Sequence, residues 1–335
     1  MRTALVGYGL GGAAFHAPFI EATPGLTLSA VVTSNPARQA EVSARYPNAR
    51  LLSSLDEVWS GNFDLVVITT PNRFHATHAR QVLEHGLNVV VDKPFAGSAA
   101  EARALASIAS SRGLMLVPFH NRRWDGDFLT VQNLLTANTL GKVHRFESRF
   151  ERYRPEIKSS WKESGDPADL GSILFDLGTH LVDQSVALFG RPLSVHAEIA
   201  TVRPGARADD DVFLSLSHEN GVRSHLWMSA LAADLGPRFR VLGHDAAYVK
   251  YGMDPQEELL KAGDTPAGPG WGEEPEDAWG TLGGKPHRTE PGAYQNFYAA
   301  VAAGTAPVSP QDAVTGLEVI EAAKQSATTG DSVTL

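Results

Sequence analysis

The chain has 335 residues, more than the roughly 100 to 200 residues of an ordinary domain, and two domains are therefore predicted. Acidic residues outnumber basic residues by 38 to 29, and the net charge of −9 disfavours nucleic acid and anionic membranes as partners. Cysteine is absent from the sequence, which excludes disulfides, thiolate metal sites and cysteine nucleophiles. Since no segment approaches the roughly 18 uncharged apolar residues of a membrane span, we expect a soluble, cytoplasmic protein.

Short apolar runs alternate with amphipathic stretches over residues 1–120. Parallel strands covered by helices on both faces have this continuous apolar character, so the pattern predicts a doubly wound Rossmann domain of the α/β class. The predicted strands are residues 3–6, 28–33, 65–70, 88–91 and 114–118, and the predicted helices are residues 38–46, 76–84 and 99–111. Gly86 and Gly113 stand where helix C-caps belong.

The pattern changes at about residue 121, and residues 121–335 are predicted to form a second domain that binds substrate and mediates oligomerisation. Its longer alternating stretches favour a large, open, mostly antiparallel sheet. The predicted strands are residues 144–152, 193–202, 212–218 and 223–229, and the predicted helices are residues 127–137, 172–189 and 310–328. Residues 261–292 contain 13 glycines or prolines, which predicts a long loop without regular structure.

A glycine-rich segment follows the first predicted strand. It fits the pattern G-x-G-x-x-G and reads Gly7-Tyr8-Gly9-Leu10-Gly11-Gly12. Glycines at these positions let the backbone turn tightly and approach a pyrophosphate, whose charge is held by backbone N–H groups at the start of the next helix. The context of strand, turn and helix predicts a dinucleotide site.

The end of the second predicted strand indicates which dinucleotide binds. An acid that holds the ribose 2′-OH of NAD is expected there, but the segment offers Thr33, Ser34 and, one helical turn later, Arg38. Small hydroxyls and a guanidinium suit a 2′-phosphate, because they donate hydrogen bonds without repelling it. NADP is favoured over NAD, although Arg38 also fits a solvated helix residue.

Polar residues also follow the third and fourth main strands, at the sheet edge where ligands of such folds bind. These residues are Thr70, Pro71, Asn72 and His75 after one strand, and Asp92 and Lys93 after the next. We expect them to line the cofactor site, with Lys93 reaching into the cleft. A surface role for Lys93 and metal binding by His75 with His78 remain alternatives.

Asp176 and His180 are spaced i, i+4 in the predicted helix 172–189, which places both on one face. A carboxylate can hold an imidazole in one tautomer and support its cation, as an alcohol-deprotonating base requires. A satisfied core histidine and a zinc site are the alternatives. Asn121, Arg122 and Trp124 follow the last Rossmann strand and are candidate polyol-binding residues.

Together these motifs resemble the glucose-fructose oxidoreductase/inositol dehydrogenase (Gfo/Idh/MocA) family. The matching segments are residues 7–12, Thr70-Pro71-Asn72 with His75, Asp92-Lys93-Pro94 and Asp176-Leu177-Gly178-Thr179-His180. Phe15-His16-Ala17-Pro18, residues 250–256 and residues 292–298 are similar to the branch with NADP-dependent scyllo-inositol dehydrogenases. The resemblance implies a Rossmann domain, a second α/β domain with a large open sheet, and the catalytic residues Lys93, Asp176 and His180. Asp92 stands where the family usually has glutamate.

We therefore predict an NAD(P)-dependent dehydrogenase or reductase that moves a hydride between NADP(H) and a carbinol or carbonyl carbon of an inositol, sugar or related polyol. His180 would take the hydroxyl proton, Lys93 would bind the same oxygen and Asp176 would orient the imidazole. A nicotinamide-dependent glycoside hydrolase with transient oxidation and a noncatalytic NADP-responsive binding protein remain open. No metal is predicted. Apolar residues on both faces of strands 212–218 and 223–229 predict a homodimer or higher symmetric oligomer.

Overall fold

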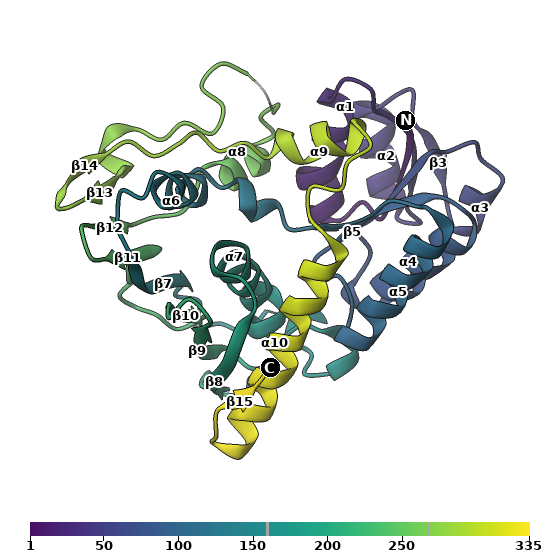
Figure 1. Ribbon diagram of the computed structural model, residues 1–335. Helices are drawn as coiled ribbons and strands as arrows, with labels where there is room; N and C mark the ends of the chain where they lie inside the picture. Colours follow the sequence, from purple (N-terminus) through teal and green to yellow (C-terminus); the bar gives the residue numbers. More distant parts are fainter. Residues whose placement is uncertain (159–160, 267) are drawn as a thin grey trace. The chain divides into compact units, whose positions relative to one another are not determined.

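The computed structural model describes residues 1–158, 161–266 and 268–335 and is drawn in Figure 1. The chain divides into two compact units, each built from three stretches of sequence. Unit 1 consists of Met1–Asn121, Gln256–Trp271 and Ala293–Gln311, and unit 2 consists of Arg122–Pro255, Gly272–Gly292 and Asp312–Leu335. Position 267, inside the predicted loop 261–292, lies outside the described residues. None of the helices described has the length and apolar character needed to cross a membrane.

Unit 1 contains a six-stranded, wholly parallel sheet with the strand order β3-β2-β1-β4-β5-β6, which confirms the predicted Rossmann fold. The strands are β1 (Arg2–Val6), β2 (Thr27–Val32), β3 (Arg50–Leu52), β4 (Leu65–Ile68), β5 (Asn88–Asp92) and β6 (Leu116–Phe119). β4 is buried throughout, as expected for a strand covered on both faces. β3 was not predicted, because three residues are too few to show a periodic pattern.

Two helices of unit 1, α2 (Pro36–Arg45) and α5 (Ala99–Arg112), begin at capping residues. Asn35 accepts hydrogen bonds from the backbone of Ala37 and Arg38, and Ser98 caps α5 in the same way. Gly113 ends α5 in the left-handed conformation, as predicted. The helical segments are η1 (Gly11–His16), α1 (Ala17–Ala22), α2 (Pro36–Arg45), α3 (Asp56–Trp59), η2 (Asn72–Phe74), α4 (His75–Glu84), α5 (Ala99–Arg112), α8 (Gln256–Ala262) and α9 (Gln295–Ala302). Figure 1 shows α4 and α5 side by side.

Two late segments of the chain complete unit 1, although they lie within the range 121–335 predicted for the second domain. The Gln256 side chain accepts hydrogen bonds from Trp271 Nε1 at 3.2 Å and from Tyr294 N at 2.9 Å. Phe297 of α9 packs edge-on against Phe119 of β6, with ring centroids 4.8 Å apart. These contacts join α8 and α9 to the Rossmann sheet.

Unit 2 contains a nine-stranded sheet of order β14-β13-β12-β11-β7-β10-β9-β8-β15. Among the described strands of this second sheet, only β7 and β10 pair in parallel, which confirms the predicted, mostly antiparallel sheet. The strands are β7 (Val143–Glu151), β8 (Pro192–Ala200), β9 (Asp211–His218), β10 (Arg223–Ser229), β11 (Phe239–Gly243), β12 (Ala247–Lys250), β13 (Gly280–Leu282), β14 (Lys285–His287) and β15 (Val333–Thr334). Helices α6 (Gly126–Thr136), α7 (Thr179–Phe189) and α10 (Pro310–Thr329) accompany it.

One face of this sheet forms the core of unit 2. Leu214, Leu226 and Met228 are fully buried, and Phe146 lies between Phe189 of α7 and Phe239 of β11. Helices α6 and α7 therefore cover the same face, since Phe128 of α6 also contacts Phe239. The alternate residues of β9 and β10 point to the opposite, less buried face.

Two predictions about secondary structure were wrong in detail. Residues 172–189 are not one α-helix: a π-helical turn, η6 (Leu174–Gly178), precedes α7. Gly178 stands at this junction, where a Cβ would lie 3.1 Å from the sulfur of Met228, so the glycine admits the close approach of β10. The segment 261–292 is not wholly irregular, because β13 and β14 form a hairpin whose turn, Gly283-Gly284, has positive φ angles of 57° and 80°.

Candidate functional site

The glycine-rich segment forms a tight turn between β1 and η1. Gly7 has a φ of 98°, and a Cβ there would lie 2.7 Å from the Thr69 carbonyl oxygen. A Cβ at Gly12 would collide with the Gly7 carbonyl oxygen, whereas a Cβ at Gly9 would meet no atom within 4 Å. The turn thus needs Gly7 and Gly12 to close, and Gly9 leaves its backbone open to a ligand. This open cradle fits a pyrophosphate.

The two other side chains of the predicted motif behave differently from each other. Leu10 is 64% exposed beside the open backbone of Gly9. Tyr8 is buried, and this burial raises the pKa of its hydroxyl well above the usual value. Only the backbone of Tyr8 is therefore available to a ligand at this turn.

The end of β2 carries the residues predicted to select the cofactor. Thr33 is buried and held by two contacts, since its carbonyl oxygen accepts from Gln39 Nε2 at 2.9 Å and its Oγ1 from Asn35 N at 3.4 Å. Ser34 and Arg38 are exposed at the first turn of α2. The side chain of Asn35 is occupied in capping that helix. The Ser34 hydroxyl and the Arg38 guanidinium are thus exposed to a ligand at the end of β2.

The ends of β4 and β5 are joined by a buried histidine. His75 Nε2 lies 2.7 Å from the Thr70 carbonyl oxygen, and Nδ1 lies 2.8 Å from the Pro94 carbonyl oxygen. Carbonyl oxygens only accept hydrogen bonds, so the N–H of the imidazole can donate to a backbone carbonyl at either strand end. His75 therefore braces the turn that follows Lys93. Burial lowers the pKa of the neighbouring His78, and the charge of His75 lowers it further.

The turn after β4 is also tied to the glycine-rich turn. Thr69 Oγ1 donates to the Gly7 carbonyl oxygen at 2.8 Å. Asp92, at the end of β5, points its Oδ2 toward Gly11, where an added Cβ would lie 2.8 Å away. Its other oxygen accepts from Lys93 N at 2.7 Å. Three strand ends predicted from sequence to line the cofactor site thus converge within unit 1.

In unit 2 the predicted substrate residue Arg122 and the predicted base His180 meet the same aromatic ring. The Arg122 guanidinium lies 4.7 Å from the centre of the Phe150 ring, and the His180 ring centroid lies 6.3 Å from it. Arg122 and His180 are both about 5% exposed. Phe150 was not identified from the sequence, because it stands in an ordinary alternating strand. Trp124 is half-buried in the same unit, and Asn121 ends unit 1.

The surroundings of Asp176 differ from those expected. Asp176 lies in the π-helical turn and His180 in α7, so the regular i, i+4 geometry does not apply. The Asp176 Oδ1 accepts a hydrogen bond from Lys162 Nζ at 2.8 Å, and the Asp176 Oδ2 lies 3.6 Å from Arg152 Nη2. Burial lowers the pKa of Arg152, an effect that the charge of Asp176 opposes. Neither basic residue was identified from the sequence, because neither is close to Asp176 along the chain.

Other polar residues of α7 have structural partners. Asp183 accepts from Arg123 Nη2 at 2.7 Å, and Arg123 also reaches Asp312 at 3.0 Å. Gln184 donates to the Arg122 carbonyl oxygen at 2.8 Å. These bonds fix α7 to the turn that carries Arg122.

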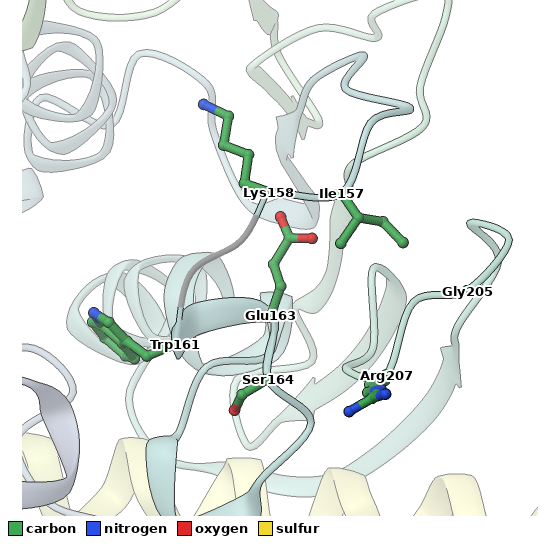
Figure 2. Close-up of a pocket in the computed structure, with 7 residues that line it drawn as sticks. All are labelled: Ile157, Lys158, Trp161, Glu163, Ser164, Gly205 and Arg207. Carbon is green, nitrogen blue, oxygen red and sulfur yellow. The ribbon is translucent and has the colours of Figure 1, made fainter.

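Unit 2 contains an open cavity of about 480 Å³, and Figure 2 draws the residues that line it. It is lined by Ile157, Lys158, Trp161, Glu163, Ser164, Gly205 and Arg207. None of the predicted site residues lines this cavity. Lys162, which stands between the lining residues Trp161 and Glu163, does contact the predicted site residue Asp176. No group of three His, Asp or Glu side chains that could hold a metal ion occurs within residues 1–158, 161–266 and 268–335.

Comparisons with known proteins agree with this architecture. A family model described as an oxidoreductase family with an NAD-binding Rossmann fold matches residues 1–120, and one for the GFO/IDH/MocA C-terminal domain matches residues 128–249. The chain is 40% identical to the uncharacterized oxidoreductase YdgJ of Escherichia coli, with 98% of this chain and 96% of YdgJ covered. It is 32% identical to IolW of Bacillus subtilis, named scyllo-inositol 2-dehydrogenase (NADP(+)), with 97% and 93% covered.

A solved structure of YvaA from Bacillus subtilis superposes with a TM-score of 0.93 at 30% identity, and the match covers 100% of this chain and 99% of YvaA. Sequence and structural similarity thus extend over both sheets rather than over the Rossmann fold alone. The chain belongs to the Gfo/Idh/MocA family of oxidoreductases and carries its NAD-binding Rossmann domain.

Proposed function

We propose that this oxidoreductase transfers a hydride between NADP(H) and a carbinol or carbonyl carbon of an inositol, sugar or related polyol. The observation that carries the proposal is the similarity to IolW over nearly the whole of both chains, since IolW is named an NADP-dependent scyllo-inositol 2-dehydrogenase. The exposed Ser34 and Arg38 support the choice of NADP, because no carboxylate at residues 33–38 would repel a 2′-phosphate.

The residues of unit 1 would hold the cofactor. The backbone of Gly7, Tyr8, Gly9, Leu10 and Gly12 would receive the pyrophosphate. Thr33, Ser34 and Arg38 would receive the 2′-phosphate, and the remaining contacts would come from Thr70, Pro71, Asn72, His75, Asp92 and Lys93. When bound, the nicotinamide supplies the hydride chemistry.

The protein's own side chains would bind the substrate and handle its proton. His180 would accept the hydroxyl proton, and the ammonium of Lys93 would stabilise the developing alkoxide. Asp176 would support the imidazolium, and its contacts with Lys162 and Arg152 favour the ionised carboxylate that this role needs. Asn121, Arg122 and Trp124 would contact the substrate hydroxyls.

The test is a panel of polyols, sugars and glycosides assayed with NADP and NAD at the reduced-nicotinamide absorbance. Lys93→Ala and His180→Ala should each lower kcat by at least about 100-fold, the lower end of what proton-transfer assistance contributes. NADPH affinity, measured by fluorescence titration, should change little in His180→Ala, because His180 is not among the proposed cofactor contacts. Lys285→Ala, which alters an exposed lysine of β14, is the matched control and should leave kcat unchanged.

Three outcomes would contradict the proposal. Near-normal turnover by a Lys93→Ala, His180→Ala double variant would remove both residues from the mechanism. Hydrolysis of a glycoside without net change in NADPH would favour the glycoside hydrolase. NADPH binding without turnover of any compound in the panel would favour the noncatalytic binding protein.

The second face of the unit 2 sheet would join copies of the chain. Phe213 and Trp227 face each other on this side with ring centroids 5.1 Å apart, and Arg149 lies 3.8 Å above the Trp227 ring. Large aromatic and arginine side chains on one sheet face are typical of protein interfaces. The proposed assembly is a homodimer or a higher symmetric oligomer.

A further inference from the structure

A buried polar network stands behind the Asp92-Lys93 turn in unit 1. His16, at the end of η1, is 0% exposed, and its Nδ1 lies 2.5 Å from the hydroxyl oxygen of Tyr298 in α9. Its Nε2 lies 3.7 Å from Asp92 Oδ2. The imidazole also packs against Phe119, with ring centroids 4.0 Å apart. One side chain thus links α9 to the end of β5.

The two polar partners of His16 favour one tautomer, because the Asp92 carboxylate can only accept a hydrogen from Nε2. Burial raises the pKa of the Tyr298 hydroxyl well above its usual value, and the charge of Asp92 raises it further, so the phenol keeps its proton. When that hydroxyl donates to Nδ1 of a neutral imidazole, Nδ1 is the acceptor and Nε2 carries the hydrogen. The Nε2–H group then faces the carboxylate of Asp92. A separation of 3.7 Å is longer than a hydrogen bond but short enough for electrostatic attraction at a site shielded from water.

Asp92 connects His16 to Lys93, because its carboxylate contacts both residues. Burial raises the pKa of Asp92, but the influence of His16, together with His75 and Lys93, outweighs burial and holds the pKa below its usual value. The ionised carboxylate accepts from the Lys93 backbone N–H at 2.7 Å through Oδ1. His16 acts on the other oxygen, Oδ2. The orientation of the carboxylate, and with it the backbone of Lys93, is therefore fixed from both sides.

A role in packing alone does not account for the two ring nitrogens of His16. The neighbours Phe119, Phe297 and Tyr298 form an aromatic cluster in which an apolar side chain could replace His16. Burying an imidazole there costs free energy unless its nitrogens are satisfied. Its two nitrogens face two specific groups, one of which adjoins the lysine to which we assign catalysis.

We propose that His16, held by Tyr298, is a positioning residue that sets the Asp92 carboxylate and thereby the orientation of Lys93 for the reaction. This inference rests on the proposed function. It adds His16 and Tyr298 as residues that support Lys93, and all of these residues belong to unit 1.

The first test separates positioning from packing. His16→Leu removes both polar contacts, and we expect kcat to fall by at least about tenfold, because small misplacements of a catalytic group are costly. NADPH affinity should change by less than about threefold, since the glycine-rich turn keeps its own contacts. His16→Gln, which keeps an N–H donor, should recover part of kcat, and Tyr298→Phe should lower it less than His16→Leu. Phe119→Leu changes the packing of the imidazole without removing a polar contact and is the matched control.

A double-mutant cycle asks whether His16 acts through Lys93. In the Lys93→Ala background, His16→Leu should lower kcat by less than about twofold, because the group that it positions is gone. A full tenfold loss in that background would show that His16 acts by another route. An unchanged kcat in the single His16→Leu variant would overturn the proposal outright.

A measurement without cofactor or substrate separates this inference from the proposed function. Hydrogen exchange of the Lys93 amide, followed by mass spectrometry, should be faster in His16→Leu than in the wild type and unchanged in Phe119→Leu. Equal exchange in wild type and His16→Leu would contradict positioning even if the enzyme proves to be a polyol dehydrogenase. Faster exchange together with no turnover of any polyol would leave the positioning intact and reject the assigned reaction.

Discussion

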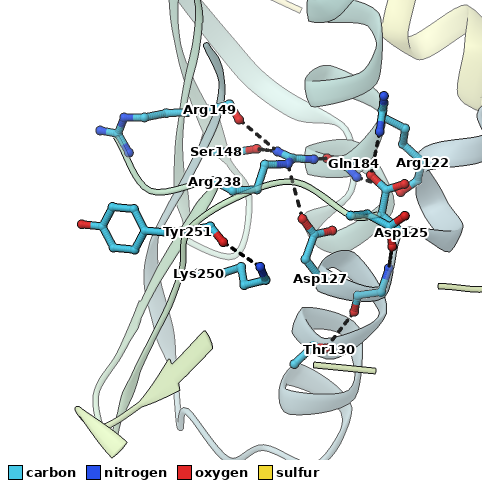
Figure 3. Close-up of polar contacts among 12 residues, drawn as sticks. Arg122, Asp125, Asp127, Thr130, Ser148, Arg149, Gln184, Arg238, Lys250 and Tyr251 are labelled. Atoms are coloured by element: carbon cyan, nitrogen blue, oxygen red, sulfur yellow. Dashed lines mark hydrogen bonds and ion pairs between the residues drawn. The ribbon is translucent and has the colours of Figure 1, made fainter. Parts of the chain in front are cut away.

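The ion pair between Lys250 and Glu274 offers a sharp test of how unit 2 is held together. Lys250 Nζ is fully buried, lies 3.1 Å from Glu274 Oε1 and donates to the Tyr251 carbonyl oxygen at 2.6 Å. The bond to Tyr251 is drawn in Figure 3. The Glu274 side chain is only 3% exposed, and its Oε2 has no hydrogen-bond partner among the described residues. Within residues 1–158, 161–266 and 268–335, Lys250 is therefore the cation on which this carboxylate depends.

Lys250→Met keeps much of the side-chain volume and removes the charge. The variant leaves the Glu274 carboxylate buried without compensation, and we expect the free energy of unfolding to fall by about 3 to 5 kcal/mol. In the double variant Lys250→Met, Glu274→Met neither charge of this pair remains, and most of this loss should be recovered. Lys261→Met is the control, because Lys261 pairs with the partly exposed Glu257 and Glu258 and should cost at most about 1 kcal/mol.

Urea unfolding followed by circular dichroism would measure these differences, with the same denaturant dependence required of each variant. A Lys250→Met variant within about 1 kcal/mol of wild type would refute the reasoning, since burial of an unpaired carboxylate cannot be that inexpensive. A double variant as unstable as the single one would show that lost packing, rather than charge, causes the effect.

Three further predictions follow from named residues. Thr33→Asp should weaken NADPH binding relative to NADH by at least about tenfold, or about 1.4 kcal/mol, and an unchanged ratio in binding titrations would contradict the assigned 2′-phosphate site. Burial raises the pKa of Asp127 from 3.8 to about 6 despite the opposing charge of Arg238. The folded state therefore binds this proton more tightly than the unfolded state, and stability should be lost as pH rises from about 4 through 6. Asp127→Asn should lose less stability than wild type between these pH values in urea titrations. Phe213→Glu with Trp227→Glu should convert an oligomer to the monomer in light scattering, and a wild type that is monomeric at micromolar concentration would reject the interface.

Local patterns in the sequence were sufficient for the elements whose stability depends on neighbouring residues. The apolar runs that became β1, β4 and β5 are buried on both faces, so each strand shows its environment in its own composition. Gly7 and Gly113 were also identifiable, because a positive φ is required at each and glycine adopts it at little cost. The alternation of these apolar strands with helices then led to the Rossmann fold.

Only the tertiary structure decided which residues meet across long stretches of sequence. His16 and Tyr298 are 282 residues apart, and Asp176 meets Lys162 and Arg152 from elements whose own sequences give no sign of the contact. The π-helical turn that carries Asp176 likewise depends on its setting, since Gly178 accommodates the sulfur of Met228 from β10. In each case the favourable free energy arises from burial and charge shared between distant segments, and a pattern read along the chain contains only one of the partners.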